Sequence, residues 1–207
     1  MQGLYVQYGC GWNVPAGWLH FDASPTLRWE RVPLLGRLWT RNARRFPKSV
    51  RYGDIVKGLP VGRKSCAGIY CSHVLEHLAL ADLGRALANT YEYLREGGTF
   101  RFVMPDLEQL AKSYVGDPDP GAAHRLMKDS LLGRERRARR FIEFWIEWAG
   151  NSYHLWMWDE KAMTEELRKH GFRNIRRAQF GDAQDRKFDE IEEKHTFGGC
   201  LAMQCGK

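Results

Sequence analysis

One strand–helix–strand unit near the middle of the sequence constrains its fold more than any other feature. β-type residues run from Ala67 to Cys71 and again from Thr99 to Met104. Between them, leucine and tyrosine recur at helical spacing over residues 80–94, and Gly97-Gly98 follows as a C-cap would. A strand, a helix and a second strand in this order predict a crossover connection, and therefore an α/β protein with a mainly parallel sheet.

Shorter β-type runs on both sides of this unit extend the predicted sheet. They are Leu4–Tyr8, Trp18–Phe21, Ser49–Tyr52, Phe172–Ala178 and Gly199–Cys205. A long helix is predicted over residues 122–149, and Asp159 is predicted to cap another helix that ends at His170-Gly171. The acidic stretch from Asp182 to Glu193 is expected to be a linker between the last two strands. We expect one domain, 1–207, with a substantial core.

Positive charge is concentrated in one part of the chain. The protein has 32 Lys and Arg against 25 Asp and Glu, a formal charge of +7. Residues 28–64, called the basic segment below, contain eleven basic and two acidic side chains and carry +9, so the rest is slightly negative. A basic chain of this size is compatible with a nucleic-acid binder, a membrane-surface protein or an enzyme with an anionic substrate. The choice among these classes depends on particular residues.

Several protein classes are disfavoured by what the sequence lacks. No apolar run approaches the roughly 18 residues of a membrane span. The first residues lack the pattern of a signal peptide, so a cytoplasmic protein is expected. The five cysteines are odd in number, and the pairs Cys66/Cys71 and Cys200/Cys205 are each five apart on predicted strands, which puts their side chains on opposite faces. The sequence therefore predicts neither a disulfide framework nor a metal site.

The first candidate site combines Gly9-x-Gly11 after one strand with Asp22 at the end of the next. Glycines let the backbone approach a ligand closely, and an acid at this position can accept both hydroxyls of a ribose. The dinucleotide-binding fingerprint requires a third glycine, a full helix and an acid about 20 residues further on. Here Val14 holds the third position, and Pro15-Ala16-Gly17 interrupts any helix. A nucleoside without a diphosphate is therefore favoured, with a simple tight turn as the alternative.

Two further groups of polar residues follow predicted strands. Asp54 ends a predicted strand, where its carboxylate can accept a hydrogen bond from an adenine amino group; the alternative is an ordinary strand-ending aspartate. Ser72, His73, Glu76 and His77 follow the strand that ends at Cys71, at the sheet edge where open α/β proteins bind ligands. The alternative for the glutamate is a favourable helix start, and for any single histidine it is ordinary packing.

In chain order, these features resemble the class I S-adenosyl-L-methionine (SAM) dependent methyltransferases. The likeness is closest to the methyltransferase type 11 group, in a short form with a reduced first helix. The resemblance rests on these motifs in chain order: GCG after the first strand, the acid that closes the second strand, then GD, SHVLEH and REGG, and last a strand that ends in VMPD. It covers residues 4–110 well. The resemblance implies a Rossmann-like α/β fold with a seven-stranded sheet whose last strand is antiparallel, and SAM as the cofactor.

The resemblance also implies a set of cofactor-binding positions at the carboxyl ends of the first strands. They are Tyr8, Gly9, Gly11, Asp22, Asp54, Ile55, Ser72 and His73. The first three would lie beside the methionine portion of SAM and Asp22 at the ribose. Asp54 with Ile55 would hold the adenine, and the last two would lie near the sulfonium.

The catalytic candidates are histidines and one aspartate. Methyl transfer from a sulfonium releases a neutral thioether, so the enzyme mainly aligns the acceptor and excludes water. A hydroxyl acceptor also needs a base, and imidazole titrates near neutrality. His73 is the first candidate and His154 the second, with His77 and Asp106 as alternatives, although each single histidine can instead be structural.

Two insertions are expected to shape the acceptor site: a basic flap at residues 23–50 and a helical, aromatic-rich cap at 115–158. The cap has six aromatic residues close together in sequence: Phe144, Trp145, Trp148, Tyr153, Trp156 and Trp158. A group of aromatic side chains can bind a sugar, an aromatic ring or a lipid, although core packing explains most of these residues equally well. For the flap, we hypothesise attraction of an anionic acceptor, to be tested by charge reversal at Arg41, Arg44 and Arg45.

The leading functional hypothesis is methyl transfer, at oxygen, to a small-molecule or glycan-like acceptor that can be anionic. The alternatives are a nucleic-acid methyltransferase, a non-catalytic SAM-binding module and a nicotinamide oxidoreductase. The predicted strand that ends at Cys71 is not followed by Asn-Pro-Pro-Tyr, the motif of enzymes that methylate base amino groups. Its absence argues against amino methylation of bases. The helix-poor link from Gly11 to Asp22 argues against a nicotinamide cofactor. The sequence does not determine the acceptor atom or the oligomeric state.

Overall fold

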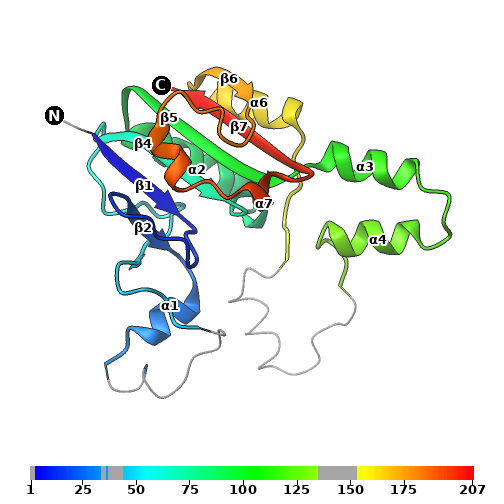
Figure 1. Cartoon of the computed structure of the whole chain (residues 1–207), viewed down its shortest axis with the longest axis horizontal. Coiled ribbons are helices and arrows are strands. Elements are labelled where there is room, and N and C mark those ends of the chain that lie inside the picture. Colours follow the sequence, from blue (N-terminus) through cyan, green and yellow to red (C-terminus); the bar gives the residue numbers. More distant parts are fainter. Residues whose placement is uncertain (1–2, 34–35, 37–43, 135–152) are drawn as a thin grey trace.

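The computed structural model describes residues 3–33, 36, 44–134 and 153–207, which are built around one seven-stranded sheet (Figure 1). The strands are β1 (Leu4–Tyr8), β2 (Leu19–Asp22), β3 (Arg51–Tyr52), β4 (Cys66–Ser72), β5 (Leu94–Pro105), β6 (Arg173–Arg177) and β7 (Cys200–Gly206). Their order is β3-β2-β1-β4-β5-β7-β6. Strands β1 to β5 pair in parallel, whereas β7 pairs antiparallel with β5 and β6. The predicted fold class and the antiparallel last strand are confirmed.

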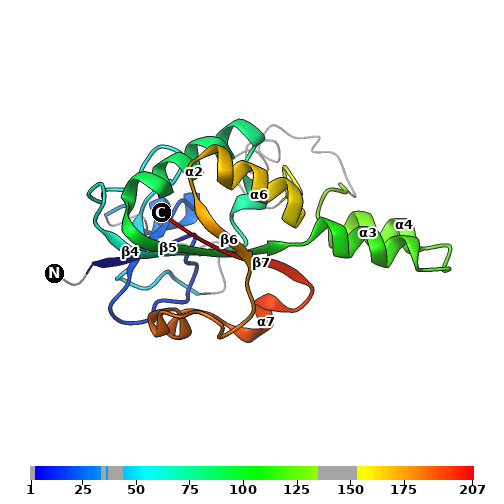
Figure 2. The same ribbon diagram turned by 90° about the horizontal axis from the view of Figure 1, so that it is seen from above.

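Helices cover the two faces of the sheet unequally. They are α1 (Pro25–Glu30), α2 (Leu80–Tyr93), α3 (Leu107–Val115), α4 (Ala122–Asp129), α6 (Glu160–Lys169) and α7 (Lys194–Phe197), with the 3₁₀ helices η2 (Leu75–His77) and η3 (Arg186–Glu190). Figure 2 shows α2 and α6 on one face and α7 on the other. No helix connects β1 to β2, as Pro15-Ala16-Gly17 predicted.

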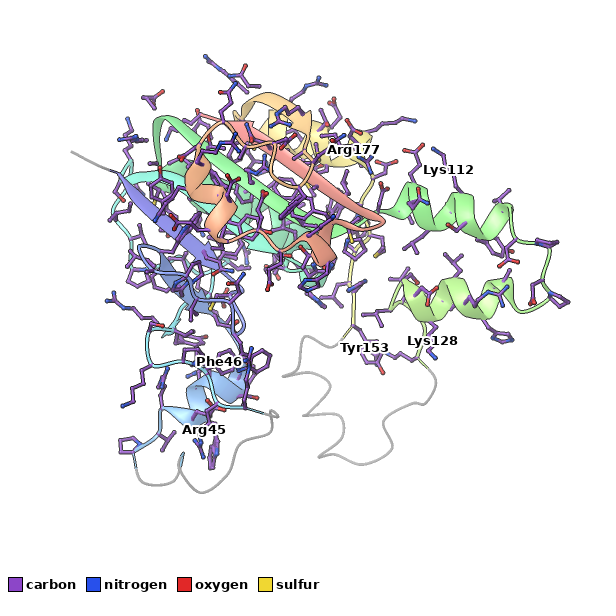
Figure 3. All side chains as sticks on the ribbon, in the orientation of Figure 1. Arg45, Phe46, Lys112, Lys128, Tyr153 and Arg177 are labelled. Atoms are coloured by element: carbon purple, nitrogen blue, oxygen red, sulfur yellow. The ribbon has the colours of Figure 1, made fainter. Side chains whose placement is uncertain are left out.

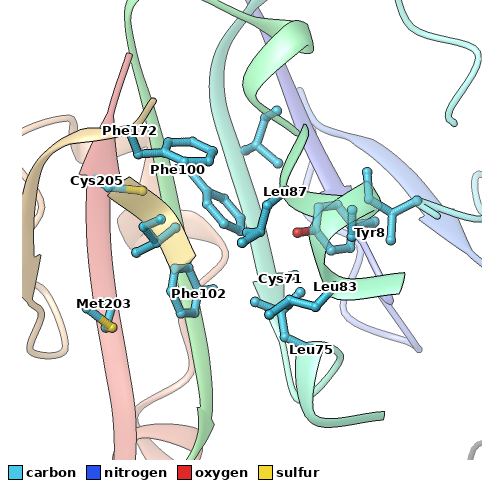
Figure 4. Packing of buried hydrophobic residues seen from close by; sticks show 14 of the residues in the cluster. Tyr8, Cys71, Leu75, Leu83, Leu87, Phe100, Phe102, Phe172, Met203 and Cys205 are labelled. Carbon is cyan, nitrogen blue, oxygen red and sulfur yellow. The ribbon is translucent and has the colours of Figure 1, made fainter. Parts of the chain in front are cut away.

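The main core lies between the sheet and α2 with α6. Phe100 and Phe102 of β5 and Leu83 and Leu87 of α2 are at most 1% exposed and belong to one cluster (Figure 4). The two leucines are four residues apart, which places both on the buried stripe of the helix. Burial stabilises each such side chain by about 1.5–3 kcal/mol. The predicted helix over 80–94 is therefore confirmed by its packing.

The end of α2 differs from the prediction. The helix stops at Tyr93, and Leu94 already has extended backbone as the first residue of β5. Gly97 and Gly98 lie inside β5, where Gly97 has a φ of +71° and the pairing with β4 shifts register. The prediction that Gly97-Gly98 is the helix C-cap is wrong, because the pairing of Leu94 with Cys66 ends the helix and the glycines accommodate the bulge.

Helix α6 begins and ends where the sequence predicted. Asp159 accepts a hydrogen bond from the Ala162 amide at 2.8 Å, as an N-cap does. Its end is followed by Gly171 in left-handed backbone, with a φ of +89°. The helix leads directly into β6, which pairs antiparallel with β7.

The acidic stretch between β6 and β7 packs against the sheet. Phe188 and Ile191 bury their side chains against Trp18 and Tyr70. Because side chains alternate along a strand, Tyr70 faces away from the core that its neighbour Ile69 joins. The stretch therefore covers the face that α2 and α6 leave open.

A buried cation explains why this stretch is acidic. Arg101 of β5 is 1% exposed, and its guanidinium lies 2.6 Å from Glu192 and 3.0 Å from Asp182. A buried charge needs partners of opposite sign, so these carboxylates are drawn onto the sheet. The stretch connects β6 and β7 as predicted, but it packs on the sheet, which the sequence did not indicate.

Helices α3 and α4 lie side by side and project from the carboxyl end of β5 (Figure 1). No residue of α3 is buried. Helix α4 ends at Asp129, so the predicted helix over 122–149 is shorter in the part that the structure describes. The predicted aromatic residues Phe144, Trp145 and Trp148 lie outside the described residues. Among the described residues, no helix is long and apolar enough to cross a membrane.

Candidate functional site

Gly9 and Gly11 form a sharp turn after β1. Both have left-handed backbone, with φ values of +65° and +53°, which glycine adopts without strain. A Cβ atom on Gly9 would lie 2.2 Å from Cγ2 of Val74, whereas a Cβ atom on Gly11 would meet nothing within 4 Å. Gly9 is therefore required by packing, and the backbone at Gly11 is open to a ligand.

Asp22 ends β2 with its carboxylate against this turn and is only 9% exposed. Its Oδ2 accepts a hydrogen bond from the Gly11 amide at 3.1 Å, and its Oδ1 accepts one from the Ser24 amide at 2.8 Å. Burial raises the pKa of Asp22, while the two amide donors act in the opposite direction. Each oxygen keeps a free lone pair, so the carboxylate can accept two more hydrogen bonds, as from the vicinal hydroxyls of a ribose.

A cavity of about 210 Å³ lies beside the turn, at the carboxyl ends of β1 and β4. Its lining residues are Gln7, Gly9, Cys10, Gly11, Asn13, Tyr70, Ser72, His73, Ile191, Glu193 and Thr196. Open α/β sheets bind their ligands at this edge. Four predicted cofactor positions, Gly9, Gly11, Ser72 and His73, are therefore brought together around one cavity.

Sequence reasoning missed the wall that the β6–β7 connection supplies to this cavity. Asn13 donates from Nδ2 to the carbonyl of Ile191 at 2.9 Å, which holds the connection against the glycine turn. Glu193 and Thr196 follow and also line the cavity. The missing helix between β1 and β2 could have indicated this wall, because another part of the chain must then cover that face of the sheet.

The side chains predicted at the adenine and methionine ends have other contacts. Asp54 Oδ1 accepts a hydrogen bond from the Val56 amide at 3.0 Å, and Oδ2 lies 3.0 Å from Lys57 Nζ. Ile55 is 5% exposed and belongs to the main core. The ring of Tyr8 is 1% exposed and belongs to the same core (Figure 4). Neither of these two apolar side chains lines the cavity.

His73 follows the end of β4 in left-handed backbone, with a φ of +55° that is uncommon outside glycine. Its amide donates to the carbonyl of Val103 at 2.8 Å, and its Nδ1 lies 3.0 Å from Ser72 Oγ. Its Nε2 lies 3.8 Å from the sulfur of Cys200. Partial burial, and then the neighbouring His77, lower the pKa of His73, so its ring is mainly neutral at pH 7. Strained backbone of this kind clusters at functional positions.

His154, the second predicted base, lies in a different cluster. It is 7% exposed, and its Nδ1 donates to the carbonyl of Ser130 at 2.8 Å. Its ring packs against His77 with centroids 4.9 Å apart, and its Nε2 is 3.9 Å from Oε1 of Glu76. Burial, followed by His77, lowers the pKa of His154. His154 is therefore grouped with Glu76 and His77, and it does not line the cavity.

Asp106, the remaining catalytic candidate, is engaged at both oxygens. Oδ1 accepts hydrogen bonds from the amides of Glu108 and Gln109 at 3.0 and 3.3 Å. Oδ2 accepts one from Arg177 at 2.5 Å, and Figure 3 labels this arginine near the start of α3. These contacts cap α3 and neutralise the buried carboxylate. The arrangement favours a positioning role over proton transfer.

Stacked side chains attach the basic segment to the glycine turn. Trp12, directly after the turn, stacks on Phe46 with ring centroids 5.3 Å apart. The guanidinium of Arg44 lies 5.5 Å from the Trp12 ring centroid. Figure 3 shows Phe46 beside α1. Arg44 thus places positive charge next to the site, while Arg41 lies outside the described residues.

Another cavity of about 210 Å³ lies near the amino ends of β4 and β5. Arg95, Thr99 and Asp185 are among its lining residues, and it contains none of the predicted site residues. The amino ends of parallel strands are not where open α/β sheets bind ligands. The cavity beside the glycine turn is therefore the candidate site.

A family model described as a methyltransferase domain matches residues 17–177 of this chain. The match includes Asp22, Asp54, Ser72 and His73 and begins after the glycine turn. No curated protein sequence matches the chain.

Solved structures of methyltransferases share the fold at low sequence identity. A SAM-dependent methyltransferase of Thermotoga maritima, described as a possible histamine N-methyltransferase, has 18% identity and a TM-score of 0.55, covering 100% of this chain and 83% of that one. A SAM-dependent methyltransferase of Archaeoglobus fulgidus has 14% identity and a TM-score of 0.52, covering 99% and 86%. A complex of the Haloferax volcanii Trm112 activator with a putative methyltransferase gives 17% identity and a TM-score of 0.51, covering 99% and 82%.

Proposed function

This chain belongs to the methyltransferase domain family and is a class I SAM-dependent methyltransferase, and from that premise we propose that it methylates an oxygen atom of an anionic small-molecule or glycan-like acceptor. Family membership supplies the reaction class and the cofactor. The acceptor is inferred from the residues around the candidate site.

The residues at the glycine turn fit SAM. Asp22 is the proposed ribose ligand, because each of its oxygens keeps a lone pair beyond its backbone donor. The open backbone of Gly9–Gly11 is the proposed contact of the methionine portion. Asp54, which follows β3, is the proposed partner of the adenine, and Ser72 and His73 are the proposed neighbours of the sulfonium. SAM supplies an electrophilic methyl group, and these residues orient it toward the acceptor.

His73 is the proposed proton acceptor. In the tautomer that carries the proton on Nδ1, this atom donates to Ser72 Oγ, and Nε2 has the lone pair that would take the proton of an acceptor hydroxyl. A ring that is mainly neutral at pH 7 suits this role. His73 also lines the cavity, whereas His154 lies in a separate buried cluster and both oxygens of Asp106 are engaged.

Charge and exposed aromatic surface support the acceptor class. The basic segment carries +9, and Arg44 brings part of that charge to the glycine turn through Trp12. Trp156 is 44% exposed, although its neighbour Trp158 is only 3% exposed. An exposed indole suits stacking on a sugar ring, and basic groups suit a carboxylate or a phosphate on the acceptor.

The observation that carries the proposal is the Asp22 carboxylate, preorganised by two amides beside a cavity that His73 lines. The test has two stages: calorimetric titration with SAM and its demethylated product, then transfer of labelled methyl groups from SAM to pools of metabolites and glycans. We expect both ligands to bind, and label to enter acidic sugars or phosphate esters. Failure to bind either ligand would overturn the site, and label that enters only RNA would overturn the acceptor class.

The anionic acceptor has its own test at the basic segment. The triple variant Arg41→Glu, Arg44→Glu, Arg45→Glu should weaken acceptor binding at low salt and leave SAM binding unchanged, because the arginines act on the acceptor. Unchanged acceptor binding would remove the basic segment from the proposal.

The proposed location is the cytoplasm. All five cysteines are free thiols, which is typical of a reducing compartment.

A further inference from the structure

Three potential metal ligands, Glu76, His77 and His154, lie close together. Glu76 and His77 belong to η2, and His154 comes from the chain that leads to α6. One ligand atom from each lies within 4.8 Å of the other two. The carbonyl of Glu76 accepts hydrogen bonds from the amides of Leu155 and Trp156 at 2.8 and 3.2 Å. These backbone bonds hold residues 76 and 154 together, so the grouping is built into the fold.

The carboxylate of Glu76 has no hydrogen-bond partner among the described residues. The residue is 0% exposed, and neither Oε1 nor Oε2 accepts a hydrogen bond. The closest cationic candidate, His154 Nε2, is 3.9 Å away, beyond hydrogen-bond distance. Burying an ionised carboxylate without a partner is costly, so a positive charge at this position would remove a large penalty. The contrast with buried Asp106, whose oxygens have three donors, shows that the chain supplies partners elsewhere.

Both histidines are oriented as metal ligands are. His77 Nδ1 donates to the carbonyl of Tyr153 at 3.0 Å, and His154 Nδ1 donates to the carbonyl of Ser130 at 2.8 Å. A carbonyl oxygen can only accept, so each Nδ1 carries the proton and each Nε2 keeps its lone pair. A backbone carbonyl that fixes the tautomer in this way is the usual outer contact of a histidine bound to a metal.

We propose that Glu76, His77 and His154 bind one divalent transition-metal ion through a carboxylate oxygen and two Nε2 atoms. Two imidazoles and one carboxylate suit Zn²⁺, Mn²⁺, Fe²⁺ or Co²⁺ better than Mg²⁺ or Ca²⁺, which prefer oxygen ligands alone. Bonds of about 2.0–2.2 Å require the three side chains to close around the ion by about 1 Å. Three protein ligands leave coordination positions open.

The open positions give the ion a role in the proposed reaction. Glu76 and His77 follow His73 closely in the chain, so the ion would lie near the end of the cavity that His73 lines. An acceptor that presents a hydroxyl beside a second oxygen, such as a vicinal diol or a hydroxy acid, would bind the ion through oxygen and lose its proton more easily. This role rests on the proposed function, whereas metal binding itself does not.

Uptake of Co²⁺ tests the site directly. The chain is treated with a chelator, exchanged into metal-free buffer and titrated with Co²⁺, whose visible absorption reports nitrogen and oxygen coordination. We expect one ion per chain in the unmodified protein, and at least a 10-fold weaker affinity in Glu76→Gln and in His154→Gln. The matched control is His124→Gln on α4, since His124 is exposed and should not contribute.

Thermal unfolding separates loss of the site from loss of the fold. Glu76→Gln keeps the side-chain shape and replaces a buried carboxyl group that accepts no hydrogen bond from the described residues, so the metal-free variant should melt near the temperature of the metal-free parent. Co²⁺ or Zn²⁺ should raise the Tm of the parent and of His124→Gln in proportion to ion concentration, and leave Glu76→Gln unchanged.

The outcomes distinguish this inference from the proposed function. If the parent binds SAM but takes up no more Co²⁺ than Glu76→Gln, the metal site is overturned and the proposed function stands. If His124→Gln loses as much Co²⁺ as His154→Gln, the uptake is adventitious and the site is again overturned. If Co²⁺ binds as expected and SAM does not, the metal site stands and the proposed function fails.

Discussion

Asp22 and Glu76 are two buried carboxylates near the carboxyl edge of one sheet, and their surroundings are opposite. Asp22 accepts hydrogen bonds from two backbone amides, and its oxygens keep room for two more donors. Glu76 accepts none from the described residues, although two histidines face it. The first carboxylate has room for neutral hydroxyl donors, and the second is the proposed ligand of a cation. Burial alone therefore does not predict which ligand an acidic residue takes.

The two carboxylates also differ in how the chain builds their surroundings. The donors of Asp22 are Gly11 and Ser24, which lie on the adjoining turns. Glu76 meets His154 only because the chain returns to η2 after a long excursion through α3 and α4. The first arrangement is local and the second depends on the tertiary fold.

The largest expected effect is at His73, which lines the cavity beside the glycine turn. His73→Asn removes the proposed base, so the rate of methyl transfer should fall about 10²–10⁴-fold. The dissociation constant for SAM, measured by calorimetry, should change less than about threefold, because Asp22 and the glycine turn remain. His124→Asn is the control. A rate within about twofold of the parent would show that the base lies elsewhere.

The turn that supports Asp22 should be the most sensitive point for stability. Gly9→Ala introduces a left-handed alanine whose Cβ meets Val74 at 2.2 Å, and should lower the free energy of unfolding by about 2–4 kcal/mol. Gly11→Ala has similar backbone strain without the clash and should cost only about 1 kcal/mol. Urea unfolding of both variants measures the difference. Equal losses would contradict the packing argument for Gly9.

Asp22→Asn tests whether the Asp22 carboxylate binds the ribose of SAM. Asparagine keeps one acceptor oxygen, but its amino group would face one of the two backbone amides that donate to Asp22. One hydrogen bond is therefore lost at the turn, and a second is lost to the ribose hydroxyls. We expect SAM to bind about 10–100-fold more weakly, equivalent to about 1.4–3 kcal/mol. Calorimetry gives this value directly, with Asp54→Asn for comparison. Unaltered SAM affinity in Asp22→Asn would exclude it as the ribose ligand.

Arg44→Ala should have the smallest effect. Its guanidinium is near the protein surface above Trp12, where a single charge contributes about 0.2–1 kcal/mol. We therefore expect acceptor binding to weaken about two- to fivefold at low salt and the difference to disappear at high salt. A difference that persists in high salt would point to a direct contact that the geometry around Trp12 does not explain.

The parts of the fold and site that were predicted share a local cause. The strand Leu4–Tyr8, the glycine turn and Asp22 follow one another in sequence, and their pattern alone determines where the chain turns. The cap at Asp159 is local in the same sense. Neighbouring residues therefore indicated the proposed ribose end of the site.

The parts that were missed depend on contacts across the molecule. The stretch from Asp182 to Glu193 was expected to be a linker because nothing in its neighbourhood reveals buried Arg101. The glycines at 97–98 resemble a helix end, and only the pairing of Leu94 with Cys66 places them in a strand. The metal-ligand set was missed because His154 is far in sequence from Glu76, and no spacing rule connects them.

The most direct test of the difference between the two carboxylates is one pair of titrations on two variants. SAM and Co²⁺ are each titrated into Asp22→Asn and Glu76→Gln by calorimetry. We expect Asp22→Asn to lose affinity for SAM and keep Co²⁺, and Glu76→Gln to lose Co²⁺ and keep SAM within about twofold. If both variants lost both ligands to the same extent, or if neither lost either, the two carboxylates would not have the separate roles assigned to them.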